Sequence, residues 1–182
     1  MTTKAIRYRR KRSGQTDYKA RRYLLSSRKF RIVIRRSLRH VQVQIIQYKP
    51  EGDRVLVSAD SKELRKLGWN FGLKNTPACY LTGLLLAKKA KEKKLAEGVV
   101  DLGRYSTTRG NKLFAVVKGM ADGGLQVPVP EKACPSKDRL EGKHIAGFVD
   151  KSVAQQFSTY KKNNISLTSI KEKVAEVVKK IQ

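Results

Sequence analysis

Residues 30–46 read FRIVIRRSLRHVQVQII, and this stretch decides the fold because apolar and polar side chains alternate along most of it. The alternation breaks over residues 37–40 and then resumes. A period of two is typical of strands with one buried face, so the segment predicts two β-strands joined by a turn. Arg31 and Arg35 share one side of the first strand, which predicts a basic face there.

The segments that follow have the order of a mixed α/β sheet. A third strand is expected at residues 54–59, because Pro-Glu-Gly-Asp at 50–53 has turn composition. The apolar segment at 99–103 predicts a fourth strand, which a right-handed crossover makes parallel to one earlier strand. A helix is predicted after Asn111. We therefore expect an α/β fold, a three-stranded antiparallel meander followed by helix, strand and helix, similar to the ribonuclease-H-like mixed sheet.

Capping residues predict where the helices of this core begin. Asp60 and Glu63 have the spacing of a capping box, and Gly68 is expected to end the short helix between them. The segment Asn75-Thr76-Pro77 predicts the start of the longest helix, with either Asn75 or Thr76 as its N-cap.

The long helix is predicted to be amphipathic. Leu81, Leu84 and Leu85 form an apolar stripe that we expect to face the core. The lysines within residues 88–94 are interpreted as a solvated face, and Gly98 as the end of the helix.

Charge divides the chain into three predicted parts. The net charge is +26, and the first fifty residues hold sixteen Lys or Arg against one acid, Asp17, which leaves +15 there and +11 on the rest. Residues 1–29 have too little apolar surface to order alone and are predicted to be a basic nucleic-acid-binding arm with a short helix capped by Asp17. Residues 30–128 are the expected α/β core domain, and residues 129–182 a C-terminal extension ending in an amphipathic helix.

A concentration of positive charge this strong predicts a polyanionic partner. Tyr8, Tyr18 and Tyr23 lie among the basic residues, where their rings are suited to stacking on unpaired bases. For Trp69, in a compact loop between glycines, two interpretations stay open: it stacks on bases, or it closes the edge of the sheet. No apolar run approaches the ~20 residues of a membrane span, so we expect no membrane partner.

The sequence gives little basis for catalysis or metal binding. Cys79 and Cys134 are far apart, and His40 and His144 are the only histidines, so no clustered zinc ligands are predicted. A nuclease with the ribonuclease-H-like topology needs several carboxylates around its metal ions. Asp101 lies in the fourth strand, but the first strand holds no acid. We therefore expect no enzyme, no cofactor and no metal site.

Several motifs resemble one family, the large-subunit ribosomal proteins numbered eighteenth in the bacterial series, in their archaeal form. The most specific is Asn-Thr-Pro-Ala-Cys-Tyr-Leu-Thr-Gly at residues 75–83. Matching segments also include Thr-Asp-Tyr at 16–18, Val-Ile-Arg-Arg-Ser at 33–37 and Arg-His-Val at 39–41. The likeness covers residues 5 to about 160, with Cys79 where an alanine is expected.

The resemblance implies a structural constituent of the large ribosomal subunit in the cytoplasm. Proteins of this family bind 5S ribosomal RNA and anchor it to the large-subunit RNA in the central protuberance. The implied partners are therefore 5S rRNA, large-subunit rRNA and neighbouring ribosomal proteins, including the other 5S-binding protein. The alternative is a general basic nucleic-acid-packaging protein, while a DNA reader would need a recognition helix rich in Arg, Asn or Gln.

The charge pattern and the resemblance together predict a set of RNA-binding residues in the arm, the first strand and two loops. These are Arg7, Tyr8, Arg9, Arg10, Lys11, Arg12, Tyr18, Lys19, Arg21, Arg22, Arg28, Arg31, Arg35, Arg36, Arg39, His40, Trp69, Lys74 and Asn75.

Overall fold

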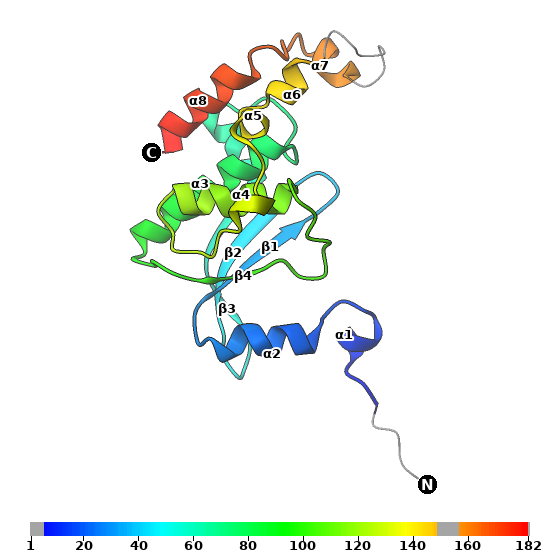
Figure 1. Cartoon of the computed structure of the whole chain (residues 1–182), viewed down its shortest axis with the longest axis vertical. Coiled ribbons are helices and arrows are strands. Elements are labelled where there is room, and N and C mark those ends of the chain that lie inside the picture. The colour runs from blue at the N-terminus through cyan, green and yellow to red at the C-terminus, as the bar shows by residue number, and fades with distance from the viewer. Residues whose placement is uncertain (1–5, 149–156, 182) are drawn as a thin grey trace.

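A computed structural model describes residues 6–148 and 157–181, so the first five residues of the arm and residues 149–156 of the C-terminal extension lie outside the described part. A four-stranded sheet lies between two groups of helices, with α1 and α2 at one end of the molecule and α8 at the other (Figure 1). The elements are α1 (Arg9–Arg12), α2 (Tyr18–Ser26), β1 (Arg31–Arg36), β2 (Val41–Gln47), β3 (Arg54–Asp60), the 3-10 helix η1 (Ser61–Leu67), α3 (Thr76–Glu92), β4 (Val99–Asp101), α4 (Lys112–Asp122), the 3-10 helix η2 (Glu131–Ala133), α5 (Lys137–Leu140), α6 (Lys143–Ala146), α7 (Ser158–Lys162) and α8 (Ile170–Ile181).

The sheet has the predicted mixed topology. Its strand order is β3-β2-β1-β4, with antiparallel pairing of β1 to β2 and of β2 to β3. Strand β4 returns after α3 and pairs in parallel with β1, so that Arg31 lies opposite Val99 and Val33 opposite Asp101. The predicted meander, crossover and fourth strand are confirmed.

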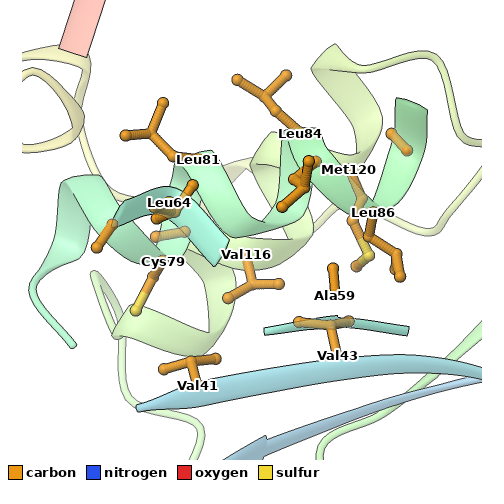
Figure 2. Close-up of a cluster of buried hydrophobic side chains, with 14 of the residues drawn as sticks. Val41, Val43, Ala59, Leu64, Cys79, Leu81, Leu84, Leu86, Val116 and Met120 are labelled. Atoms are coloured by element: carbon orange, nitrogen blue, oxygen red, sulfur yellow. The ribbon is translucent and has the colours of Figure 1, made fainter. Parts of the chain in front are cut away.

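Helix α3 is the centre of the core rather than a one-sided amphipathic helix. Nearly every residue from Thr76 to Ala87 is buried, because the sheet covers one side of the helix and α4 and α8 cover others. Figure 2 shows Val41 and Val43 of the sheet below Leu81, Leu86 and the facing side chains of α4. The predicted stripe of leucines is buried, but it is only part of a helix buried almost all round.

The caps form largely as the sequence predicts. Asp60 and Glu63 complete the capping box of η1, and Gly68 ends it in the left-handed region at φ 93°. The Asn75 side chain accepts a hydrogen bond from the Ala78 N–H at 2.8 Å and caps α3. Asp17 and Asn111 cap α2 and α4 in the same way.

The end of α3 differs from the prediction, which placed it at Gly98. The helix ends at Glu92, because Lys94 adopts φ 57° and closes a Schellman turn. In this turn the Leu95 N–H donates to the Ala90 carbonyl at 2.9 Å, and the Lys94 N–H donates to the Lys91 carbonyl at 2.9 Å. Leu95 is then free to pack against the core, which stabilises a left-handed residue other than glycine.

Two lysines at the C-terminal end of α3, Lys89 within the helix and Lys93 just after it, do more than face solvent. Strand β3 is at the edge of the sheet, and its outward carbonyl groups have no neighbouring strand. Lys89 Nζ donates to the Ser58 carbonyl at 3.0 Å, and Lys93 Nζ donates to the Leu56 carbonyl at 2.7 Å. The predicted solvated face of α3 therefore also protects the free edge of the sheet.

The final helix, α8, is amphipathic as predicted. Ile170, Val174, Val177 and Ile181 are buried, and the helix packs against α3 and η1. Lys180 Nζ donates to the Leu67 carbonyl at 3.2 Å and fixes this contact. The short elements α1, η2, α5, α6 and α7 were not predicted, because each has five residues or fewer and no repeating apolar pattern.

Helices α3 and α4 cross with glycine on both sides of the contact. A Cβ atom on Gly83 would lie 2.3 Å from the Val116 carbonyl oxygen, and one on Gly119 would lie 2.1 Å from the Tyr80 carbonyl oxygen. Both clashes are with backbone atoms, which cannot move without separating the helices. Glycine is therefore required at both positions.

We expect Gly119→Ala to destabilise the protein by about 2 kcal/mol, since overpacking a core contact outweighs the gain in helix propensity. Thermal melting measures the effect. Gly147→Ala is the matched control, because its added Cβ would lie 3.4 Å from its nearest neighbour, an ordinary contact. A melting temperature for Gly119→Ala equal to that of the control would show that α3 and α4 lie too far apart for the added Cβ to clash.

Candidate nucleic-acid interface

The N-terminal arm, residues 6–29, presents exposed cations on two short helices. Asp17 begins α2 by accepting hydrogen bonds from the N–H groups of Lys19 and Ala20 at 3.0 and 3.1 Å. With its one carboxylate used in this cap, the arm offers a surface of positive charge. The predicted arm residues that are exposed are Arg7, Tyr8, Arg9, Arg10, Lys11, Arg12, Lys19, Arg22 and Arg28.

Two tyrosines of the arm pack against each other. The ring centroids of Tyr8 and Tyr18 are 5.3 Å apart with an interplanar angle of 41°. Tyr8 is 72% exposed, whereas Tyr18 is partly buried beneath it. The pair therefore offers one open ring, that of Tyr8, to an unpaired base.

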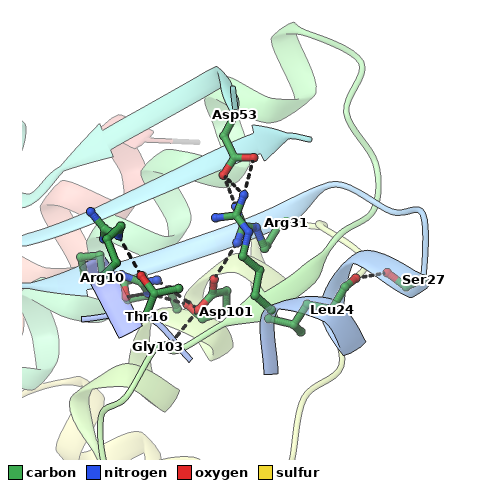
Figure 3. Close-up of polar contacts among 11 residues, drawn as sticks. Arg10, Thr16, Leu24, Ser27, Arg31, Asp53, Asp101 and Gly103 are labelled. Atoms are coloured by element: carbon green, nitrogen blue, oxygen red, sulfur yellow. Dashed lines mark hydrogen bonds and ion pairs between the residues drawn. The ribbon is translucent and has the colours of Figure 1, made fainter. Parts of the chain in front are cut away.

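Two carboxylates hold the arm on the outer face of the sheet. Asp53, in the turn before β3, accepts from Arg21 Nη2 of α2 at 3.0 Å to each oxygen, and also from Arg31 Nη2 of β1. Arg31 Nη1 donates in turn to Asp101 of β4 at 3.3 Å. Figure 3 shows Arg31 between Asp53 and Asp101. A continuous ion-pair network thus joins α2 to three strands or strand ends.

Asp101 also organises the loop that follows β4. Its Oδ1 accepts from Arg35 Nη2 at 3.1 Å and from the Gly103 N–H at 2.8 Å. The next residue, Arg104, donates to the Gly14 carbonyl of the arm. Its contacts with Arg31, Arg35 and Gly103 make the Asp101 carboxylate a structural anchor.

A cleft of about 260 Å³ remains between the arm and the sheet. Its polar lining combines five guanidinium groups, from both the arm and the core, with the carboxylates of Asp17, Asp53 and Asp101. The arginines that line it are Arg10, Arg21, Arg31, Arg35 and Arg104.

A second basic surface, which we call the α3 groove, lies where α3 and α4 begin. It is about 750 Å³ in volume and is lined by side chains from the β1–β2 turn, η1, the loop before α3 and the first residue of α4. Among the residues that the structure describes, those lining this groove include no carboxylate. The basic residues of the α3 groove are Arg39, His40, Lys62, Arg65, Lys74 and Lys112.

Positive charge near the α3 groove acts on the pKa of a buried neighbour, the Cys79 thiol. Burial raises the pKa of the Cys79 thiol to about 12, while nearby Lys112, Lys74 and Arg36 act in the opposite direction by favouring the thiolate. Since burial prevails, Cys79 stays a neutral thiol packed in the core.

The structure divides the predicted residues between these two surfaces. Arg39, His40, Lys74 and Asn75 line the α3 groove, away from the arm. Arg36 lies between the two surfaces, with its guanidinium 4.7 Å from the centroid of the Tyr105 ring. Lys62, Arg65, Arg104 and Lys112 were not predicted, because their positions in the sequence give no sign that folding brings them to these surfaces.

Two of the residues predicted to bind RNA, Trp69 and Arg31, lie in the interior, so the prediction is wrong for both. Trp69 is fully buried, its Nε1–H donates to the Gly72 carbonyl at 3.3 Å, and its ring packs on Phe71 at 5.2 Å. The loop is apolar enough to fold into the core, which leaves no face for a base. Arg31 is 7% exposed, and its guanidinium pairs with two carboxylates instead of a phosphate.

Within residues 6–148 and 157–181, no group of three His, Cys, Asp or Glu side chains is placed to hold a metal ion. In the same part of the chain, no helix combines the length and the apolar character needed to cross a membrane.

Comparison with known proteins identifies a match over most of the chain. The family model described as ribosomal large subunit proteins 60S L5 and 50S L18 matches residues 3–99. Three archaeal relatives are each named large ribosomal subunit protein uL18. That of Korarchaeum cryptofilum is 44% identical over 97% of this chain and 93% of its own length. That of Methanoregula boonei is 46% identical over 81% of this chain and 84% of its own length. That of Methanothermobacter thermautotrophicus is 39% identical over 97% of this chain and 94% of its own length.

Proposed function

The chain belongs to the family of ribosomal large-subunit proteins 60S L5 and 50S L18, and from this premise we propose that it binds 5S ribosomal RNA and anchors it to the large-subunit RNA. The family assigns it a structural role in the large ribosomal subunit, without a catalytic function. The proposal adds the identity of the RNA, its place in the central protuberance, and the neighbours there, including the other 5S-binding protein.

The observation that carries the proposal is the docked basic arm. The exposed cations of α1 and α2 project from a segment whose one carboxylate caps a helix. Folded RNA presents a dense array of phosphates, which such a surface neutralises, while an open ring such as that of Tyr8 meets an exposed base. Arginine is suited to this work because its planar fork binds phosphate through two N–H groups.

The α3 groove supports the anchoring part of the proposal. Arg39 and His40 follow the last residue of β1, whereas the arm leads into its first residue. The basic surfaces therefore lie toward opposite ends of this strand. A protein that joins two RNA molecules needs two such surfaces, and we propose that the arm and the α3 groove contact different RNA segments.

The same observations support a division of labour along the chain. We propose that residues 1–29 act as the RNA-binding arm, residues 30–128 as the core that carries it, and residues 129–182 as an extension. The buried hydrophobic cluster begins at Ile32 among the described residues, so the core does not depend on apolar side chains of the arm.

Competition between RNAs tests the proposal directly. The full chain is titrated with 5S rRNA, with a scrambled RNA of equal length and with duplex DNA, all at one salt concentration. We expect a clear preference for 5S rRNA. Equal affinity for the three would favour the alternative, a general nucleic-acid-packaging protein, because phosphate charge alone carries no sequence information.

The salt dependence of binding should report the number of phosphate contacts. If the two surfaces together make roughly 6–10 contacts, log affinity should fall with log salt at a slope of about −4 to −9. Replacing exposed Arg9 and Arg12 with alanine should flatten this slope by about one to two units. Fluorescence titrations from low to high salt measure it.

The matched control replaces two exposed lysines at the C-terminal end of α3, Lys91 in its last turn and Lys94 just after it, which lie outside both surfaces. Their removal takes away the same charge and should leave the slope nearly unchanged. Equal flattening by both pairs would show that net charge, rather than these surfaces, governs affinity.

A further inference from the structure

We propose that Asp53 is a positioning residue for RNA binding, which holds the arm in its binding orientation although its own charge repels RNA. The inference rests on the proposed function and assigns a task to a residue that makes no RNA contact itself. Its basis is the bridge that Asp53 makes between Arg21 of α2 and Arg31 of β1.

The bridge joins a fixed side chain of the core to a side chain of the arm and so limits the movement of α2. Arg31 is nearly buried and is held on its second side by Asp101, so it offers Asp53 a fixed partner. Asp53 in turn accepts from Arg21 through both of its oxygens. The Arg21 side chain is 32% exposed and that of Asp53 21% exposed, so water screens this contact only in part.

A second attachment holds the arm at the turn before α2. Asp101 accepts from the Gly103 N–H at 2.8 Å and so sets the loop that carries Arg104. Arg104 donates to the Gly14 carbonyl, in the turn between α1 and α2. With Gly14 and Arg21 both tied to the core, α2 has little freedom to turn away from the sheet.

The carboxylates of this network reduce the positive charge that is available to RNA. Three guanidinium groups, from Arg21, Arg31 and Arg35, pair with two carboxylates. The protein's own acids therefore neutralise most of the positive charge of these arginines. In a protein of net charge +26, an acid beside the RNA-binding surface weakens attraction to phosphate. Its compensating contribution is pre-organisation, which lowers the entropy lost when the arm binds.

Asp53→Asn is expected to change the affinity for RNA in the direction opposite to the effect of its charge alone. Removing a negative charge should tighten RNA binding if charge alone matters. If Asp53 positions the arm, Asp53→Asn should instead weaken binding of 5S rRNA about three- to tenfold, the range of a coupled ion pair. Glu51→Gln, two residues away and exposed, is the matched control and should leave binding unchanged or slightly tighter.

A double-mutant cycle separates the bridge from other effects. Arg21→Gln should weaken binding more than Arg22→Gln does, since the exposed Arg22 contributes charge without the bridge. In the Arg21→Gln background the bridge is already broken, so adding Asp53→Asn should no longer weaken binding. Because Arg31 keeps Asp101 as a partner, both variants should fold.

Amide hydrogen exchange on the free, full-length protein gives a readout that does not involve RNA. We expect the α2 amides to exchange faster in Asp53→Asn than in the unmodified protein or in Glu51→Gln. Unchanged α2 exchange would overturn the proposal, as would an Asp53→Asn affinity equal to or higher than that of Glu51→Gln. If the unmodified protein shows no preference for 5S rRNA, the proposed function fails, while the exchange result still decides whether Asp53 positions the arm.

Discussion

A chain that lacks residues 1–22 is expected to bind 5S rRNA at least about a hundredfold more weakly at 0.15 M salt, while its core still folds. The deletion removes nine Lys or Arg and the exposed ring of Tyr8. It also removes Arg21 from Asp53, but Asp53 keeps Arg31 as a partner. Affinity is measured by titration with 5S rRNA, and folding by thermal melting.

The core should survive this deletion because its buried cluster lies elsewhere. The first residue of that cluster is Ile32 and the last is Ile181. None of the deleted residues that the structure describes belongs to it. The cost to stability should stay near that of one partly exposed ion pair, about 1 kcal/mol or less. A truncated chain that no longer melts cooperatively would show that the arm is part of the core.

A charge-matched variant of the full-length protein distinguishes the arm from net charge. Replacing exposed lysines at the end of α3 and on α8, such as Lys91, Lys94 and Lys179, with glutamine lowers the charge without touching either basic surface. We expect a small loss of affinity from this variant. A loss that scales only with the charge removed would contradict the arm as the principal RNA-binding segment.

The sheet was predictable because its signals are local. The alternation in residues 30–46 marks the two strands and the face that packs on the core, although Arg31 and Val33 on the other face of β1 are buried as well, and the turn at residues 50–53 places the third strand. The helix starts were predictable for the same reason, since a cap acts within four residues of its own position. Asp17, Asp60 and Asn75 all cap the helices that the sequence assigns to them.

Features that depend on distant residues escaped prediction. Arg31 is adjacent in sequence to the arm and looks like one more free cation, yet folding places Asp53 and Asp101 on either side of it. The α3 groove gathers residues from positions 39 to 112, with no shared motif. The left-handed Lys94 lacks the glycine that usually marks a helix end.

Composition alone also cannot rank an aromatic residue as core or interface. Trp69 lies beside glycines in a loop, a position compatible with stacking on a base. Its burial is decided by Phe71 and by Tyr160 of α7, whose hydroxyl accepts from the Gly72 N–H at 2.8 Å and closes the loop. The part of the chain that covers this loop lies almost ninety residues downstream.

The largest effect on stability is expected from Leu81→Asp. Leu81 is fully buried in α3, on the side of the helix that faces away from Val41 and Val43 of the sheet (Figure 2). The substitution removes a leucine from a packed site, at a cost of about 2–5 kcal/mol, and adds a carboxylate without a partner. We expect a total loss of more than about 4 kcal/mol, measured by urea denaturation, which is a large part of the stability of a typical domain.

Lys91→Glu is the control for Leu81→Asp, because it also places an acid on α3, in the last turn of the helix and exposed to solvent. It should shift the urea midpoint very little, since surface substitutions seldom exceed about 0.5 kcal/mol. Salt offers a second distinction: screening acts on exposed charges and hardly on buried ones, so added salt should not restore Leu81→Asp. Equal midpoints for the two variants, or recovery of Leu81→Asp in salt, would contradict a helix α3 that is buried on nearly every side.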